Sequence, residues 1–323
     1  MKILHLLASP AYTGPAETVT QLALAQRALG HEVTIAVDRK RTKTTSEEPI
    51  VPRLESLQLL DTRGLELSVK SSPWALATDV LTLRGAGVDV IHSHFSHDHT
   101  LARIAKTRAT RLIRSIHAPR SLRWTTPKAD GYTIPMDSLA RQLIGQKVLV
   151  LPAFVAPEFV PSPRKQRQHK KIGMISSFQP SRRHDLGIAA FLKLNANAEL
   201  ELIGDGALEP ELRKLAEPAK DAIHFAGYHS GAAFIERLQQ LDEVWILGLG
   251  NDWSARAAAQ ARACGVRVIA VDEGDLARYA DALVEPEVDA LIAASNSDAR
   301  REVKLESPAA LAQRVLSFYE GMK

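Results

Sequence analysis

Cysteine is nearly absent from this 323-residue sequence, in which Cys264 stands alone. A single thiol excludes an internal disulfide framework and favours a reducing compartment. Long apolar runs are also missing, since none approaches the roughly 20 residues that a membrane-spanning helix needs. The apolar run at residues 3–7 is followed too soon by polar residues to be a secretory signal. We therefore expect a protein of the cytoplasm.

Aromatic residues make up only 5% of the sequence. This leaves few side chains to stack on bases, and no nucleic-acid-binding motif is present. Positive charge is uneven: residues 1–150 hold 20 lysines and arginines against 13 acidic residues, whereas the remainder holds 21 against 24. The basic first half predicts an anionic partner, such as phospholipid headgroups or an acidic glycan, and peripheral contact at the inner membrane surface. A solvated surface without a partner is the alternative.

Short apolar strands alternate with helical segments along most of the chain. Residues 2–7 predict a strand, about 15–29 a helix and 31–38 a strand, with Pro15 just inside the helix and Gly30 just past its end. Strands are also predicted at 88–95, 111–118 and 147–154. After a proline-rich, basic stretch the pattern resumes at residue 171, and an amphipathic helix is predicted from about Pro308 to Tyr319. Such alternation is typical of doubly wound parallel sheets.

The segment from Asn251 to Asp272 contains a loop, a short helix, a turn and an apolar strand. It resembles the donor-binding motif of retaining glycosyltransferases of family 4, in which two glutamates eight positions apart precede a V-I-A strand. Asp252 and Gln260 occupy the glutamate positions here. The resemblance implies that Asp252 reaches the donor sugar as a catalytic residue and that Gln260 contacts the ribose. Ser254 and Arg256 lie at the expected helix start, where a diphosphate is stabilised.

Other loops resemble the same family in the same order. Gly14 lies in a loop similar to the family's Gly-Gly-x-Glu, and Gly204 lies in a Gly-x-Gly turn. His117 ends a predicted strand where the family has a histidine over the donor sugar, which implies a catalytic contact. The family's diphosphate-binding arginine falls on Ser177. Its lysine falls on Arg182, and Arg183 follows in place of a glycine.

Histidines and arginines near His117 suggest further roles. We expect His94 and Arg120 on the acceptor side, although ordinary structural positions are the alternative for each. A zinc site built from His92, His94, His97 and His99 is a weaker alternative, because this spacing matches no familiar site. We therefore expect no metal. The resemblance implies that the enzyme uses no cofactor and that its substrate is a UDP or GDP sugar.

The resemblance implies an α/β protein with two doubly wound, Rossmann-like domains facing across a cleft, the GT-B architecture. We expect an acceptor-side domain at 1–155, a linker at 156–170, a nucleotide-sugar donor domain at 171–306 and a C-terminal helix at 307–323 that can cross back to the first domain. The expected activity is metal-independent, retaining transfer of a sugar to a cell-envelope glycan or lipid in polysaccharide biosynthesis. The alternatives are a degenerate relative that binds nucleotide, glycan or a partner without efficient transfer, and a sugar-nucleotide epimerase or hydrolase.

Overall fold

The computed structural model describes residues 1–41, 48–122, 127–163, 169–194, 197–250 and 253–322. The chain forms two compact units, Met1–Phe154 with Glu306–Lys323, and Val155–Leu305. The stretch expected to be a linker packs within the second unit: the rings of Phe159 and Phe234 lie 6.1 Å apart, and Gln239 donates a hydrogen bond to the carbonyl of Val160 at 2.9 Å. No helix among the described residues is long and apolar enough to cross a membrane.

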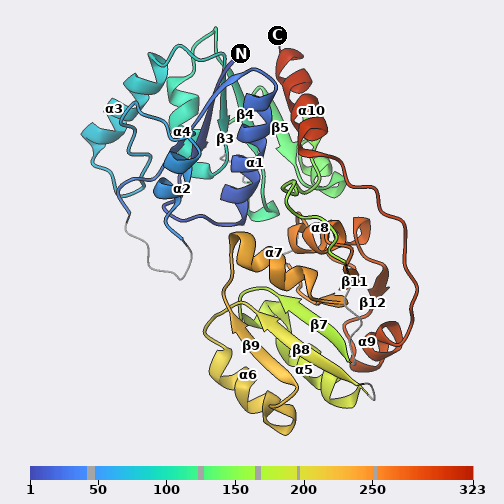
Figure 1. The fold of residues 1–323 in the computed structure, drawn as a ribbon. Coiled ribbons are helices and arrows are strands. Elements are labelled where there is room, and N and C mark those ends of the chain that lie inside the picture. Colours follow the sequence, from blue (N-terminus) through green and yellow to red (C-terminus); the bar gives the residue numbers. More distant parts are fainter. Residues whose placement is uncertain (42–47, 123–126, 164–168, 195–196, 251–252, 323) are drawn as a thin grey trace. The chain divides into compact units, whose positions relative to one another are not determined.

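The first unit is built on a six-stranded parallel sheet in the order β2-β1-β3-β4-β5-β6 (Figure 1). Its strands are β1 (Lys2–Leu7), β2 (Glu32–Val37), β3 (Val90–Ser93), β4 (Arg111–Ser115), β5 (Gly131–Ile134) and β6 (Val148–Val150). Its helices are α1 (Gly14–Ala28), α2 (Ile50–Ser56), α3 (Pro73–Arg84), α4 (Ser96–Ala105) and α10 (Pro308–Glu320). The apolar runs correctly predicted five of these strands, whereas β5, α2 and α3 were missed.

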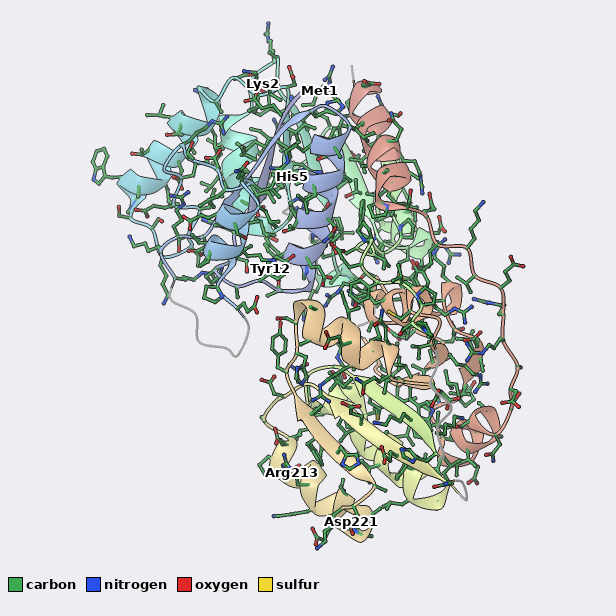
Figure 2. The ribbon with its side chains drawn as sticks, viewed as in Figure 1. Met1, Lys2, His5, Tyr12, Arg213 and Asp221 are labelled. Carbon is green, nitrogen blue, oxygen red and sulfur yellow. The ribbon has the colours of Figure 1, made fainter. Side chains whose placement is uncertain are left out.

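Alternation along β1 gives the sheet two buried faces. Ile3 and Leu7 pack with apolar residues of α1 and α10, whereas Leu4 and Leu6 point to the opposite face and pack with α3 and α4. His5 points to the same face as Ile3, because side chains alternate along a strand. Figure 1 shows α10 beside α1, and His5, which is labelled in Figure 2, is completely buried.

The C-terminal helix α10 begins at a strong helix start and then packs closely on the sheet. Ser307 caps it by accepting a hydrogen bond from the backbone N–H of Ala310, and Pro308 follows in the first turn. Such a cap stabilises a helix by about 1 kcal/mol. Gly131 of β5 makes the close contact, because a Cβ atom there would lie 2.8 Å from the ring of Phe318. Helix α10 therefore belongs to the core of the first unit.

The second unit repeats the architecture with the strand order β12-β11-β10-β7-β8-β9. Its strands are β7 (Lys170–Ile175), β8 (Ala198–Ile203), β9 (Ile223–Gly227), β10 (Glu243–Ile246), β11 (Arg267–Val271) and β12 (Ala282–Val284). Its helices are α5 (His184–Lys193), α6 (Glu209–Ala216), α7 (Gly231–Gln239), α8 (Arg256–Ala263) and α9 (Val288–Ser295). The paired strands are parallel throughout both sheets, so the predicted doubly wound α/β fold is confirmed.

Candidate functional site

The second unit has a topological switch point at β7, which lies between β10 and β8. Open parallel sheets bind ligands at such a point, outside the carboxyl ends of the strands. The loops that follow β7 and β10 are joined there, because the backbone N–H of Leu249 donates to the carbonyl of Ser181 at 2.9 Å. Each loop leads into a helix, α5 or α8. The hydrogen bond therefore brings two helix starts to one edge of the sheet.

Both helices begin with a non-glycine residue in the left-handed region. Arg183 precedes α5 with a φ of 54°, and Ala255 precedes α8 with a φ of 47°. This conformation costs about 1–2 kcal/mol for a residue with a side chain. Strained backbone of this kind is concentrated at functional sites. The unpaired N–H groups of a helix start also attract anions.

The cations expected around the donor lie on these two loops. Arg182 and Arg183 lie half-buried between β7 and α5, and Arg256 is half-buried in the first turn of α8. Ser254 is half-buried just before α8, and Gln260 is buried within it. Two loops thus carry three arginines to one edge of one sheet.

Two further positions of the expected donor site have different outcomes. Ser177, which stands at the family's arginine position, is exposed in the loop after β7. Asp252 lies outside the described residues, so its predicted catalytic role stays a prediction.

Gly204 follows β8 and shapes the edge of this site. Its φ is 151°, and a Cβ atom there would lie 2.0 Å from the carbonyl oxygen of Ser176. Gly206 has a φ of 152° and would place a Cβ 2.6 Å from the carbonyl oxygen of Phe178. Only glycine allows this approach of the two loops. The Gly-x-Gly turn therefore fixes the backbone that follows β7.

His184 was missed by the sequence analysis and lies beside the same loop. It is the first residue of α5, is 1% exposed, and its Nε2 atom is 3.2 Å from the hydroxyl of Ser176. Burial, together with the nearby charge of Arg182, lowers the pKa of His184 to about 4. It is therefore neutral at pH 7. The sequence signal that could have identified His184 is its position directly after Arg182 and Arg183.

In the first unit, four histidines form a cluster that we call the histidine cluster: His5, His92, His94 and His117. His5 of β1 pairs in register with His92 of β3, so their rings lie side by side with centroids 5.2 Å apart. His94 follows β3 and His117 follows β4, at the carboxyl edge of the sheet. The Nε2 atom of His94 lies 3.0 Å from Nδ1 of His5, and its Nδ1 atom lies 3.3 Å from Nε2 of His117.

Burial keeps the histidine cluster uncharged. It lowers the pKa of His5 and of His117 to about 4. Burial and then the neighbouring histidines hold the pKa values of His92 and His94 well below the usual range. An imidazolium costs more in a low-dielectric interior than in water, so the neutral ring is favoured. At pH 7 each ring therefore has one N–H donor and one acceptor nitrogen.

The four histidines expected as an alternative metal site do not come together. His99 points elsewhere, with its two nitrogens 2.8 Å from the hydroxyl of Ser93 and 2.8 Å from the carbonyl of Pro127. Among the described residues, the group whose nitrogens lie close enough for a metal is instead His5, His92 and His94. Every ring nitrogen of these three is already hydrogen-bonded within the protein. A metal ion would have to displace those bonds.

The remaining expected positions in the first unit lie at turns. Gly14 is the first residue of α1, after Thr13, with Pro15 just inside the helix as predicted and Glu17 also in its first turn. Arg120 is exposed in a short turn that follows His117. His94, expected on the acceptor side, is only 3% exposed and lies between His5 and His117. The ligand contacts proposed for Gly14, Arg120 and His94 stay predictions.

Comparison with known proteins adds to this geometry. Residues 13–153 match the family described as glycosyl transferase 4-like domain, and residues 169–320 match glycosyl transferases group 1. No protein of curated function matches the sequence.

Solved structures, two of them described as glycosyltransferases, have the same fold. HepE from Anabaena, crystallised with UDP, is 16% identical with a TM-score of 0.73, over 100% of this chain and 98% of its own. A glycosyltransferase from Rickettsia africae is 13% identical with a TM-score of 0.76, over 99% and 98%. The lipopolysaccharide outer core galactosyltransferase WaaB is 13% identical with a TM-score of 0.65, over 100% and 96%.

Two parallel six-stranded sheets with flanking helices, alike in fold to these enzymes, define a protein of the GT-B class. The chain belongs to the glycosyltransferases that combine a family 4-like domain with a group 1 domain.

Proposed function

We propose that this glycosyltransferase transfers a sugar, with retention of configuration, from a nucleoside diphosphate sugar to a cell-envelope glycan or lipid. The observation that carries the donor site is the hydrogen bond between Leu249 and Ser181, which joins the two arginine-bearing loops at the switch point. UDP is the first candidate nucleotide because HepE binds it, and GDP is the second. The likeness of fold to WaaB favours an envelope acceptor.

Fixed cations let this site hold a diphosphate without a metal. The leaving group gains negative charge as the sugar departs, and Arg182, Arg183 and Arg256 supply positive charge at that edge of the second unit. In the retaining reaction that we propose, the acceptor hydroxyl attacks on the face that the phosphate leaves. The departing phosphate oxygen then takes the acceptor proton, so the protein supplies no nucleophile.

Nucleotide titration with an arginine variant tests the donor site. Calorimetry of the full chain with UDP, GDP and ADP should show binding of UDP or GDP. Arg182→Ala should weaken that binding by roughly ten- to a hundredfold, because a charge-assisted hydrogen bond contributes about 1.5–3 kcal/mol. Arg213→Ala is the matched control, since Arg213 lies on α6, pairs with Glu209 and is more than half exposed. Equal losses in the two variants would contradict the assignment.

Transfer itself is tested with labelled donors in the presence and absence of a chelator. Release of nucleotide with a sugar product of retained configuration, unchanged by the chelator, is the expected result. Tight nucleotide binding without any transfer would favour the degenerate relative, for which the buried, uncharged Gln260 on α8 is the supporting observation. Transfer that requires a divalent ion would contradict the metal-independent mechanism.

We also propose that α3 and α4 contact an anionic membrane. Trp74 and Leu81 lie seven residues apart on α3 and are 85% and 67% exposed, and Ile104 on α4 is 56% exposed. Residues seven apart lie on one side of a helix. Arg84 and Arg103 are exposed on the same two helices, and Arg84 donates to the carbonyl of Ile104. Apolar side chains bordered by arginines match an anionic lipid surface.

Vesicle sedimentation tests this surface. The full chain should bind vesicles that contain phosphatidylserine and should bind phosphatidylcholine vesicles much less, with binding weakened by salt. Trp74→Ser should reduce the bound fraction severalfold, whereas Ile144→Ser, at another exposed apolar residue of the first unit, should not. Binding that depends on neither lipid charge nor Trp74 would contradict the proposal.

A further inference from the structure

A continuous series of hydrogen bonds runs through the histidine cluster and ends at the two helices that cover it. From His117 the series passes to His94, then to His5, and then to Gln26 of α1, whose Oε1 atom lies 2.9 Å from Nε2 of His5. The amide nitrogen of Gln26 lies 3.3 Å from the hydroxyl of Tyr319 on α10. Gln26, His5 and Tyr319 are each completely buried. Solvent therefore cannot replace these partners.

The other branch of the series begins at Tyr319. Its hydroxyl lies 2.6 Å from Nδ1 of His92, whose Nε2 atom is 2.8 Å from the hydroxyl of Ser115. The hydroxyl of Ser115 is in turn 2.6 Å from that of Thr133. His92, Ser115 and Thr133 share one face of the sheet, because Ser115 lies two residues after Ile113, the partner of His92, and itself pairs with Thr133. The branch gives Tyr319 a partner on each side.

The direction of every bond to His117 follows from Gln26. Its carbonyl oxygen only accepts, so Nε2 of His5 must donate. A neutral His5 then has an acceptor at Nδ1, which receives the N–H of His94 Nε2. The same step repeats once more, and Nε2 of His117 donates to Nδ1 of His94. Three neutral rings thus share one tautomer, with the proton on Nε2.

Burial prevents the ordered series from being lost by protonation. An imidazolium has two N–H donors and no acceptor. In a charged His94 or His5, one N–H would therefore point at the N–H of the neighbouring ring, and the hydrogen bond between them would be lost. The lowered pKa values agree with this, because burial opposes the charge on all four rings and the neighbouring rings oppose it further on His92 and His94. Arginine and carboxylate side chains take no part in these hydrogen bonds.

We infer that Gln26, acting through His5 and His94, holds His117 in the tautomer that carries its proton on Nε2, so that Nδ1 is an acceptor for a hydroxyl of the donor sugar. Gln26, His5 and His94 are positioning residues in this inference, and His117 is the residue that meets the sugar. The sugar contact rests on the proposed function, whereas the tautomer does not. The acceptor atom selects donors that offer a hydroxyl at this point over analogues with fluorine or an ether there.

The tautomer is read directly from the full-length protein labelled with ¹⁵N-histidine. Two-bond proton–nitrogen spectra distinguish the protonated ring nitrogen, and loss of one ring system in His117→Gln assigns the signals. The expected result is a proton on Nε2 of His117 in the parent protein. A proton on Nδ1 would mean that the Gln26 amide is turned over and that the series runs in reverse, which would overturn the inference.

Three variants separate positioning from packing. Gln26→Met keeps a similar volume but removes the acceptor, so both tautomers of His117 should appear. Gln26→Glu keeps an acceptor, and the parent tautomer should remain. Ser115→Ala breaks a bond on the other branch and should leave His117 unchanged. An unchanged tautomer in Gln26→Met, or the same change in Ser115→Ala, would contradict the role of Gln26.

Donor kinetics then test the contact with the sugar. In Gln26→Met we expect kcat/KM to fall in proportion to the fraction of His117 that keeps its proton on Nε2, about twofold if the two tautomers are equally populated, with recovery in Gln26→Glu. The deoxyfluoro donor that matches the contacted hydroxyl should lose this sensitivity to the variant. A tautomer that changes while kcat/KM does not would overturn the sugar contact. Failure of all transfer with the tautomers as expected would instead count against the proposed function.

Discussion

The two units each bury a polar network, and the two networks differ in charge and in place. In the first unit the histidine cluster is neutral and reaches the carboxyl edge of the sheet at His94 and His117. In the second unit the network is charged and lies at the amino edge, where Glu243, Arg267 and Lys170 are the first residues of β10, β11 and β7. Ligands bind at the carboxyl edge of such sheets. Position therefore distinguishes a network that supports a site from one that supports the fold.

The charged network of the second unit, which we call the Glu243 network, links the end of α9 to the sheet. The completely buried carboxylate of Glu243 pairs with Arg267 and with Lys170, and it accepts hydrogen bonds from the indole of Trp245 and the hydroxyl of Ser295, both at 2.6 Å. Arg267 also donates to the carbonyl of Ala294, and Lys170 donates to the carbonyl of Ser295. Cations at the last carbonyls stabilise the end of α9.

Removing the central carboxylate gives the largest expected effect. Glu243→Ala should lower the free energy of unfolding of the second unit by about 3–5 kcal/mol, because it leaves the charge of Arg267 buried without its partner. Guanidinium unfolding followed by tryptophan fluorescence measures this. Lys220→Ala, which breaks an exposed pair with Glu217, should change stability by under about 0.5 kcal/mol. A loss of less than about 1 kcal/mol in Glu243→Ala would refute the structural role of the network.

Acid should affect the first unit through its neutral histidines. The pKa of His5 is lowered to about 4 in the folded state, so its contribution is complete above pH 6.5 and is lost as pH falls from 6.5 toward 4. The loss approaches about 3 kcal/mol for a shift of this size. Urea unfolding between pH 7 and pH 4 should show a declining free energy. His5→Gln should make the decline shallower by about 1.4 kcal/mol per pH unit.

Asp98 contributes with the opposite sign in the same pH range. Burial raises the pKa of Asp98 from 3.8 to about 7. The free energy of unfolding therefore falls as pH rises from 3.8 to 7, and it increases again as pH falls through this range. Asp98 lies at the start of α4, where its carboxylate accepts from the backbone of Ala8 and of Phe95. As pH falls, the stability gained from Asp98 offsets the stability lost from one histidine. All four histidines of the cluster lose stability in this direction, so the net change is a loss. Stability independent of pH in this range would contradict the neutral cluster.

The comparison also shows where sequence reasoning succeeds. Nearly continuous apolar runs such as residues 2–7 indicate strands of a parallel sheet, because both faces of the sheet are covered by helices. The resemblance placed the arginines at the ends of β7 and β10, and these strands are neighbours in the sheet. The local pattern of strands and helices was therefore predictable, whereas the order of the strands in the sheet comes from the structure. β5 (Gly131–Ile134) was not predicted, since its residues Gly, Tyr, Thr and Ile form no continuous apolar run.

The polar networks were beyond the sequence for a physical reason. His5 lies 21 residues from Gln26, and His92 lies 227 residues from Tyr319. Only the packing of α1 and α10 on one face of the sheet brings these side chains together. The histidine spacing at 92–99 therefore suggested the wrong group, because His5 joins the cluster from another strand and His99 turns away.

The smallest effect concerns backbone strain at the carboxyl edge of the second unit. Arg183→Gly should raise the free energy of unfolding by about 0.5–1 kcal/mol, since glycine adopts a φ of 54° without the cost that arginine has. Ala255→Gly relieves a similar strain but removes a methyl group that is 1% exposed, worth about 0.8 kcal/mol, so its stability should hardly change.

Calorimetry separates strain from charge in the same pair of variants. Arg183→Gly should bind the nucleoside diphosphate severalfold more weakly, because a cation is lost, whereas Ala255→Gly should bind as the parent does. If Arg183→Gly is more stable but binds the nucleotide less well, the strained conformation of Arg183 serves ligand binding. The Glu243 network at the amino edge, in contrast, serves the stability of the fold. Weaker folding of Arg183→Gly with unchanged nucleotide affinity would instead assign Arg183 to the fold.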